Sequence, residues 1–184
     1  MNDNKSKFAG YFKFEKCTIT SFNGSEINII PMIFNIDIFE DLYSPFLTIE
    51  LTLLDNTGLY SKLPFRGEEI VTMTLKDPSG AGLEERQFFI YKMKDLVNTE
   101  RTYSYTLCLI SIEAVVDLSI KLSKAYKGTP SDIAKEIISK DVLQTDKQLT
   151  FEQTKNSISF IANYWSPLQT MKFLCERAVS KNGL

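Results

Sequence analysis

The chain has 184 residues, of which 43% are hydrophobic and 24% are charged, a composition typical of a globular protein rather than a disordered one. Its 21 Lys and Arg residues stand against 23 Asp and Glu residues, giving a net charge of −2 without any basic block. This balance argues against nucleic-acid binding that depends on bulk positive charge. The length suits one ordinary domain with a smaller second one.

Histidine is absent from the sequence, which excludes a Ser-His-Asp triad, a Cys-His dyad and a His-ligated metal centre. The three cysteines, Cys17, Cys108 and Cys175, are scattered and lack the paired spacing of a zinc site. We interpret each of them as a small buried residue. No metal or other cofactor is expected, and we predict that the chain is not an enzyme.

The beginning of the chain shows no secretory signal, because residues 1–7 are polar and no apolar segment comes after them. The longest apolar stretch, residues 29–34, is too short to cross a bilayer. The odd number of cysteines favours a reducing compartment. We therefore expect synthesis in a cytoplasm and no membrane partner.

Residues 8–112 are predicted to form successive β-strands. Apolar and polar residues alternate with period two over residues 34–38, 47–53, 71–76 and 103–109. Asn23-Gly24 suits a tight hairpin turn, and the two-sided apolarity of residues 29–33 beside Pro31 indicates an irregular strand or a bulge. About six short strands in this span predict one antiparallel barrel or barrel-like sandwich.

After residue 112 the pattern becomes helical. Residues 111–126 have a mixed apolar pattern that we interpret as a helix. Thr129-Pro130 predicts a helix over 130–140, and Ser166-Pro167 predicts a second over 167–182 with Gly183 as its stop. The expected fold class is α+β, with an N-terminal antiparallel β-barrel over 1–117 and a small helical subdomain over 118–184.

Two groups of residues are candidates for chemistry. The paired acids Glu40-Asp41, Glu68-Glu69 and Glu84-Glu85 are adjacent in sequence, so their side chains diverge and are expected on the solvated surface. The aromatic residues of the β region can line a sugar- or base-stacking groove or fill a barrel core: Tyr11, Phe12, Phe14, Phe22, Phe88, Phe89 and Tyr91. A carbohydrate- or peptide-binding β-sandwich module is thus the alternative function.

Three stretches carry a resemblance to a known family. Residues 39–54 are similar to a strand that comes after an acidic turn, and residues 58–75 resemble a loop-Gly-acid-Ile lead into the next strand. Residues 164–183, with Trp165-Ser166-Pro167-Leu168, look like a linker helix that precedes a second barrel. The arrangement resembles the N-terminal part of the baseplate hub proteins of contractile-tailed bacteriophages, which are related to the spike proteins of type VI secretion.

The resemblance implies a structural role in the phage tail. A hub subunit of this family adapts a sixfold tail tube to a threefold spike, so the implied partners are further copies in a homotrimer, the tail tube protein and the central spike protein. No small-molecule substrate is implied, and DNA is only passing cargo in the lumen. The implied location is the baseplate of the virion. The family also continues into a second barrel, so we expect these residues to belong to a longer protein and to associate weakly alone.

Assembly of this kind needs rigid β-barrels with pairable edges and long hairpins. The connection over residues 77–86 is the candidate intersubunit hairpin, with charged flanks formed by Lys76, Glu84, Glu85 and Arg86. An ordinary exposed loop is the other interpretation of the same segment.

Overall fold

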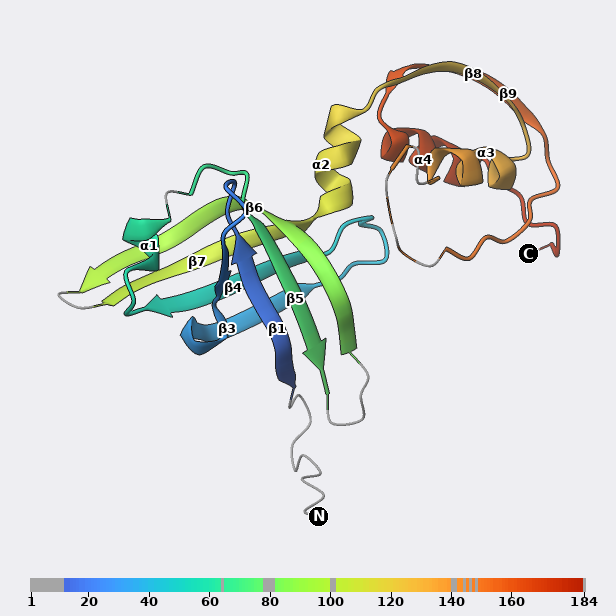
Figure 1. The fold of residues 1–184 in the computed structure, drawn as a ribbon. Coiled ribbons are helices and arrows are strands. Elements are labelled where there is room, and N and C mark those ends of the chain that lie inside the picture. Colours follow the sequence, from blue (N-terminus) through green and yellow to red (C-terminus); the bar gives the residue numbers. More distant parts are fainter. Residues whose placement is uncertain are drawn as a thin grey trace. The chain divides into compact units, whose positions relative to one another are not determined.

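The computed structural model describes residues 12–63, 65–77, 82–99, 102–139, 142–143, 145, 147 and 149–183. The chain divides into two compact units, Met1–Ile112 and Glu113–Leu184. The elements of the first unit are β1 (Lys13–Thr20), β2 (Glu26–Asn28), the 3-10 helix η1 (Ile30–Met32), β3 (Ile33–Phe39), β4 (Thr48–Asp55), α1 (Leu59–Lys62), β5 (Ile70–Lys76), β6 (Gly82–Thr99) and β7 (Thr102–Ser111) (Figure 1).

The first unit is a seven-stranded, wholly antiparallel sheet with the strand order β2-β1-β5-β6-β7-β4-β3. It curls into a half-barrel (Figure 1). The consecutive strands β2 and β3 form the two edges of the sheet. β2 pairs with β1 at one edge, and β3 pairs with β4 at the other. The irregular strand or bulge expected beside Pro31 is instead the 3-10 helix η1, which separates β2 from β3.

The expected antiparallel β-rich fold is present, but the strand pairs of the described residues do not close a barrel. β1 pairs with β2 only over Thr18, Ile19 and Thr20. No described pairing joins the remainder of β1 to β3. The break at Pro31 accounts for this opening, since proline cannot donate a ladder hydrogen bond and η1 redirects the chain.

The core of the first unit lies on the inner face of the sheet. Ile49, Leu51 and Leu53 alternate along β4 and are at most 1% exposed. Leu107 and Leu109 of β7 lie beside them in register and are fully buried. Each such side chain contributes about 1.5–3 kcal/mol through burial, so the alternation seen in the sequence corresponds to the main stabilising layer.

Gly82, the first residue of β6, is required by a close backbone approach. Its φ is +147°, and a Cβ atom at this position would lie 2.3 Å from the carbonyl oxygen of Leu75. We expect Gly82→Ala to lower the free energy of unfolding by about 1–3 kcal/mol, because backbone must shift to accept the methyl group. Urea denaturation checks this. Gly67→Ala is the control: Gly67 also has positive φ, but nothing lies within 4 Å of its added Cβ. Equal losses would contradict the steric account.

The second unit contains α2 (Ile112–Ser119, whose first residue belongs to the first unit), β8 (Leu122–Gly128), α3 (Pro130–Ile137), β9 (Ile158–Trp165) and α4 (Pro167–Cys175). β8 and β9 form a two-stranded antiparallel ribbon that arches over α3 and α4 (Figure 1). Between ribbon and helices lies a small core: Tyr126, Ile133, Ala134, Ile137, Ala162 and Leu174.

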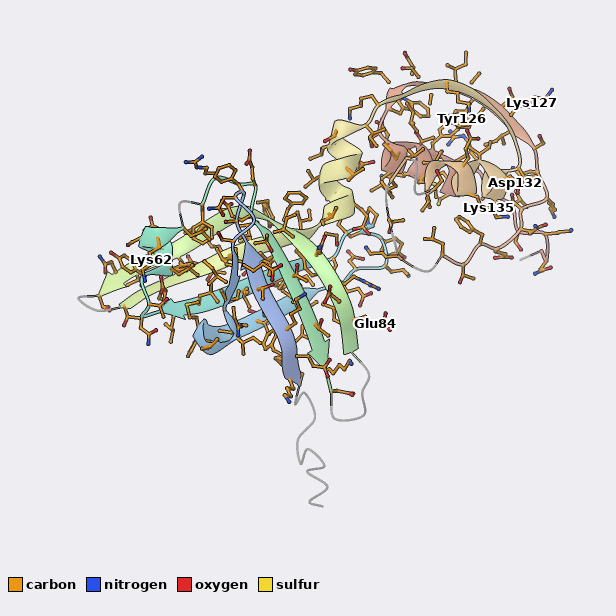
Figure 2. The ribbon with its side chains drawn as sticks, in the orientation of Figure 1. Lys62, Glu84, Tyr126, Lys127, Asp132 and Lys135 are labelled. Atoms are coloured by element: carbon orange, nitrogen blue, oxygen red, sulfur yellow. The ribbon has the colours of Figure 1, made fainter. Side chains whose placement is uncertain are left out.

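Both helix starts predicted from the sequence are confirmed. The Thr129 hydroxyl accepts a hydrogen bond from the backbone N–H of Asp132 at 3.3 Å, and Ser166 accepts one from Gln169 at 3.2 Å. Pro130 and Pro167 come directly after their caps in the first helical turn. Figure 2 shows Asp132 and Lys135 on α3, where their charged groups lie 3.5 Å apart.

Three expectations for the helical subdomain are wrong. The helix expected over 111–126 ends at Ser119, and the chain then forms strand β8. The two later helices stop early, at Ile137 and Cys175, and Gly183 therefore ends no helix. Residues after α4 pair with an earlier segment instead, since the Lys155 N–H bonds the carbonyl of residue 179 at 3.0 Å. Partners distant in sequence override local periodicity here.

Candidate functional site

A row of side chains crosses four neighbouring strands on the face opposite the core of the first unit. Asp37 of β3 lies in register beside Glu50 of β4. Glu50 lies beside Cys108 of β7, which lies in turn beside Lys92 of β6. Lys94, the next residue of β6 on this face, places its Nζ atom 2.6 Å from Oε1 of Glu50. The row is therefore acidic at β3 and basic at β6.

The charges of this row are exposed or half-buried, whereas Cys108 beneath them is only 2% exposed. The hydrogen bond to Glu50 raises the pKa of the Lys94 ammonium, which stays protonated at neutral pH. Burial raises the pKa of the Cys108 thiol. The row can thus form ion pairs, while its cysteine is held in the unreactive thiol form.

β3 is an edge strand of the sheet. β4 covers one side of it, and no strand of the described chain pairs with the other side. Phe39, on the same face as Asp37, is 53% exposed, and Phe34, at the register shift between Ile33 and Asn35, is 69% exposed. An unpaired strand with exposed apolar residues is a template for pairing with another chain.

The distal half of β6, residues 91–99, is also open on one side. β5 pairs with β6 only as far as Ile70 and Phe89, after which the Ile90 N–H bonds the Glu69 carbonyl at 3.3 Å. Beyond this point only β7 pairs with β6 within the described part of the sheet. The open stretch exposes Tyr91 and Val97. We call β3 and residues 91–99 the two open edges.

The structure places the four residues predicted for an intersubunit hairpin on the ends of β5 and β6. Lys76 pairs with Glu15 at 2.9 Å, and Glu85 pairs with Lys16 at 3.2 Å, so both bind β1, the strand next to β5. Glu84 is exposed at the beginning of β6 (Figure 2), and the Arg86 guanidinium donates to the Glu85 carbonyl at 3.3 Å. The hairpin tip, residues 78–81, lies outside the described residues, and the intersubunit role stays a prediction.

An apolar groove of about 460 Å³ adjoins these residues. It is lined by the residue before β1, by β3, by the end of β5 and by the beginning of β6: Phe12, Ile36, Ile38, Leu75 and Leu83. The groove marks the place where β1 and β3 fail to pair. Its apolar lining continues the core toward the solvent.

The structure places the paired acids in different surroundings. Glu69 is 1% exposed rather than on the surface, because its carboxylate accepts the backbone N–H groups of Arg66 at 2.8 Å and Gly67 at 2.9 Å. Glu40 and Asp41 lie in the exposed β3–β4 turn. Among the described residues, no group of three or more Cys, Asp or Glu side chains could hold a metal ion.

The candidate stacking aromatics do not make one strip. Phe88 is buried, and Phe14 packs against the core. Phe12 and Phe22 are exposed but flank opposite ends of β1. Tyr11 lies outside the described residues. This distribution favours the core interpretation for Phe14 and Phe88.

Asp55, at the end of β4, is a second buried acid of the first unit and, like Glu69, is 1% exposed. Burial alone would raise its pKa, but the backbone N–H groups of Tyr60 and Leu59, with the N–H and hydroxyl of Thr57, lower the pKa below its ordinary value. The Tyr60 N–H lies 2.7 Å from Oδ2, and the Thr57 N–H lies 3.0 Å from Oδ1. Asp55 thus fixes the turn that leads into α1.

We expect Asp55→Asn to cost about 1–3 kcal/mol of stability at pH 7, because buried N–H donors lose a charged acceptor. Since the folded pKa is lowered, this contribution is complete above the unfolded value of about 3.9 and is lost as the pH falls through the folded value. Urea midpoints at pH 7 and pH 3 check it: the difference between parent and variant should shrink at pH 3. Exposed Glu84→Gln should show almost no difference at either pH. A constant difference for Asp55→Asn would contradict the assignment.

The sequence did not identify the charged row or the second open edge. Asp37 and Lys92 are 55 positions apart, by the difference of their numbers, and only strand register brings them into one row. Cys108 and Cys17 are buried as expected, but Cys175 is exposed at the end of α4. No helix in the described part of the chain has the length and apolar character needed to cross a membrane.

No protein-family model and no curated protein sequence matches the chain. Two similar solved structures are both tail proteins by description. One is the tail protein from Neisseria meningitidis MC58, with 14% identity and a TM-score of 0.43 over 66% of this chain and 32% of that one. The other is the 43 kDa tail protein of prophage MuSo2 from Shewanella oneidensis, with 14% identity and a TM-score of 0.48 over 89% and 48%. The chain spans about a third and about half of these two proteins.

Proposed function

We propose that the chain is a structural subunit of a contractile phage tail, part of a baseplate hub that adapts a sixfold tail tube to a threefold spike. In this role it assembles with itself as a homotrimer, binds the tail tube protein and the central spike protein, and lets DNA pass through the lumen. The proposal rests on the sequence resemblance and on the open edges. Both similar structures also belong to the tail protein class by description.

The observation that carries the proposal is the pair of open edges with opposite charge. The four strands β3, β4, β7 and β6 are joined by three antiparallel pairings, so β3 and β6 run in opposite directions. A second copy related by a simple rotation can therefore place its β3 antiparallel to residues 91–99 of the first copy. The same junction then repeats from copy to copy, and such a head-to-tail contact generates a ring when the rotation closes.

Charge favours this junction over the two alternatives. In the head-to-tail arrangement, Asp37 of one copy continues the row that ends at Lys92 of the next. Pairing β3 with a second β3 would bring acidic edges together, and pairing two β6 edges would bring lysines together. Like charges directly opposite on neighbouring strands are destabilising. The row thus selects both the partner edge and the direction of assembly.

A charge exchange in the natural full-length protein tests this function. Asp37→Lys alone and Lys92→Asp alone should each weaken self-association by about tenfold, which corresponds to the coupling of one close interfacial charge pair. The double variant Asp37→Lys with Lys92→Asp should recover most of the loss. Sedimentation measurements across protein concentrations give the constants. Glu176→Lys, the same charge change on an exposed residue of the second unit, should leave them unchanged.

Two results would overturn parts of the proposal, and a third would favour the alternative function. A protein that stays monomeric at every concentration would contradict the structural, self-assembling role. A trimer that tolerates both single changes but dissociates with Glu84→Lys would move the interface to the predicted hairpin of Lys76, Glu84, Glu85 and Arg86. A saturable glycan or peptide ligand with no assembly would favour the alternative β-sandwich binding module.

A further inference from the structure

The turn between β3 and β4 presents two apolar side chains to solvent on an ordered backbone. Leu42 is 93% exposed and Tyr43 is 92% exposed. The turn is nevertheless fixed, because Oδ1 of Asp41 accepts the Tyr43 N–H at 2.9 Å and the Asp41 carbonyl accepts the N–H of residue 44 at 3.1 Å. Glu40 and Asp41 add two negative charges. We call residues 40–43 the acidic knob.

A second exposed feature combines an aromatic ring with a positive charge. Phe22, in the β1–β2 turn, is 62% exposed, and the Arg66 guanidinium carbon lies 5.1 Å from the centre of its ring. The loop that carries Arg66 is held by buried Glu69, which accepts the N–H groups of Arg66 and Gly67. The arrangement of Phe22 and Arg66 is therefore already present in a single copy. We call Phe22 and Arg66 the platform.

We propose that the acidic knob of one copy docks on the platform of the next copy. The inference rests on the proposed head-to-tail assembly and names a second contact that this assembly creates. Exposed apolar residues on an ordered turn favour a protein partner. The opposite charges of knob and platform select a second copy of this chain as that partner.

Strand register brings the knob toward the platform once the sheet continues between copies. The row that starts at Phe39 passes through Thr48 and Ile110 and ends at Phe89. Phe89 pairs with Ile70, the first residue of β5. Across the junction, the chain that leaves β3 after residue 39 therefore arrives where the next copy's loop 65–69 joins β5, and this loop carries Arg66.

The chemistry of the two surfaces is complementary. The carboxylates of Glu40 and Asp41 can pair with the Arg66 guanidinium, whose planar donors match carboxylate geometry. Leu42 and Tyr43 can pack on the exposed ring of Phe22. An aromatic residue beside an arginine is the kind of pair that concentrates binding energy at interfaces. In a single copy, the groups of the knob and of the platform are exposed. In the proposed contact, the knob and the platform cover each other.

Cysteine cross-linking of the natural full-length protein tests the contact. In a Cys175→Ser background, which removes the exposed cysteine, a Leu42→Cys copy is mixed with a Phe22→Cys copy and oxidised. We expect a disulfide-linked dimer that forms about tenfold faster than in a mixture of Leu42→Cys with Leu118→Cys, whose position is 73% exposed in the second unit. The variants change exposed residues, and circular dichroism verifies that each one is folded.

A charge exchange gives an independent measurement. Arg66→Glu should weaken self-association by about tenfold, and adding Glu40→Lys, which leaves the Asp41 hydrogen bond of the turn in place, should restore it. Equal cross-linking rates in the two mixtures, with assembly intact, would overturn the knob contact while leaving the proposed function in place. An unaltered protein that does not self-associate would overturn both the knob contact and the proposed function. Cross-links only between Phe22→Cys copies would assign the platform to a different, symmetric contact.

Discussion

Replacing Leu51 by aspartate should unfold the first unit under conditions in which the parent is stable. Leu51 is fully buried and lies in register between Ile36 of β3 and Leu107 of β7. An unpaired carboxylate there loses its hydration and gains no partner, and the apolar contacts disappear as well. The expected loss is at least about 4 kcal/mol, in the exceptional range for a single substitution.

The matched control is Leu54→Asp, on the same strand. Leu54 is 41% exposed, so its carboxylate stays in water. Far-UV circular dichroism during urea or thermal unfolding should show a large shift for Leu51→Asp and a small one for Leu54→Asp. A Leu51→Asp variant that melts within about one degree of the parent would contradict the assignment of this strand.

Replacing Leu174 by alanine should cost the second unit about 2–5 kcal/mol, because it leaves a cavity in a core of few residues. Leu174 of α4 is 1% exposed and packs in the cluster formed with Tyr126, Ile137 and Ala162. A small unit has little apolar area to offset the loss. We expect partial or complete unfolding of this unit at moderate temperature.

The single tryptophan makes this measurement specific. Trp165 is the only one in the chain and lies in the second unit, 5.1 Å between ring centres from Phe173. Its fluorescence therefore reports the second unit alone. Val179→Ala, at a position 40% exposed, is the control and should change the transition little. A Leu174→Ala transition that matches the control would show that α4 does not form this core.

Elements whose patterns are local could be predicted from the sequence. The alternation of Leu47, Ile49, Leu51 and Leu53 reflects a strand with one buried face, and β4 matches it closely. The caps at Thr129 and Ser166 are short-range hydrogen bonds, so the predicted starts of α3 and α4 are confirmed. Helix ends depend on the pairing of later residues, and pairing near residues 153–155 ends the helical run that the apolar stripe suggested.

Features that depend on distant partners were not predicted. β8 has no clear period of its own and exists because β9, more than 30 residues later, pairs with it. Asp37 and Lys92 belong to one charged row only because of the register of four strands. The sequence predicts Glu69 on the surface because the side chains of adjacent acids diverge, whereas the loop that it organises buries it. The acids of the knob were recognised as exposed, but the sequence did not connect them with Arg66.

The mass of the natural full-length protein in solution tests the central claim most directly. The proposed homotrimer, joined head to tail through the two open edges, predicts a mass of three copies by light scattering at micromolar concentration. The same preparation carrying Asp37→Lys should shift toward single copies, and adding Lys92→Asp should return it to three. A parent protein with the mass of one copy across this concentration range would contradict the account.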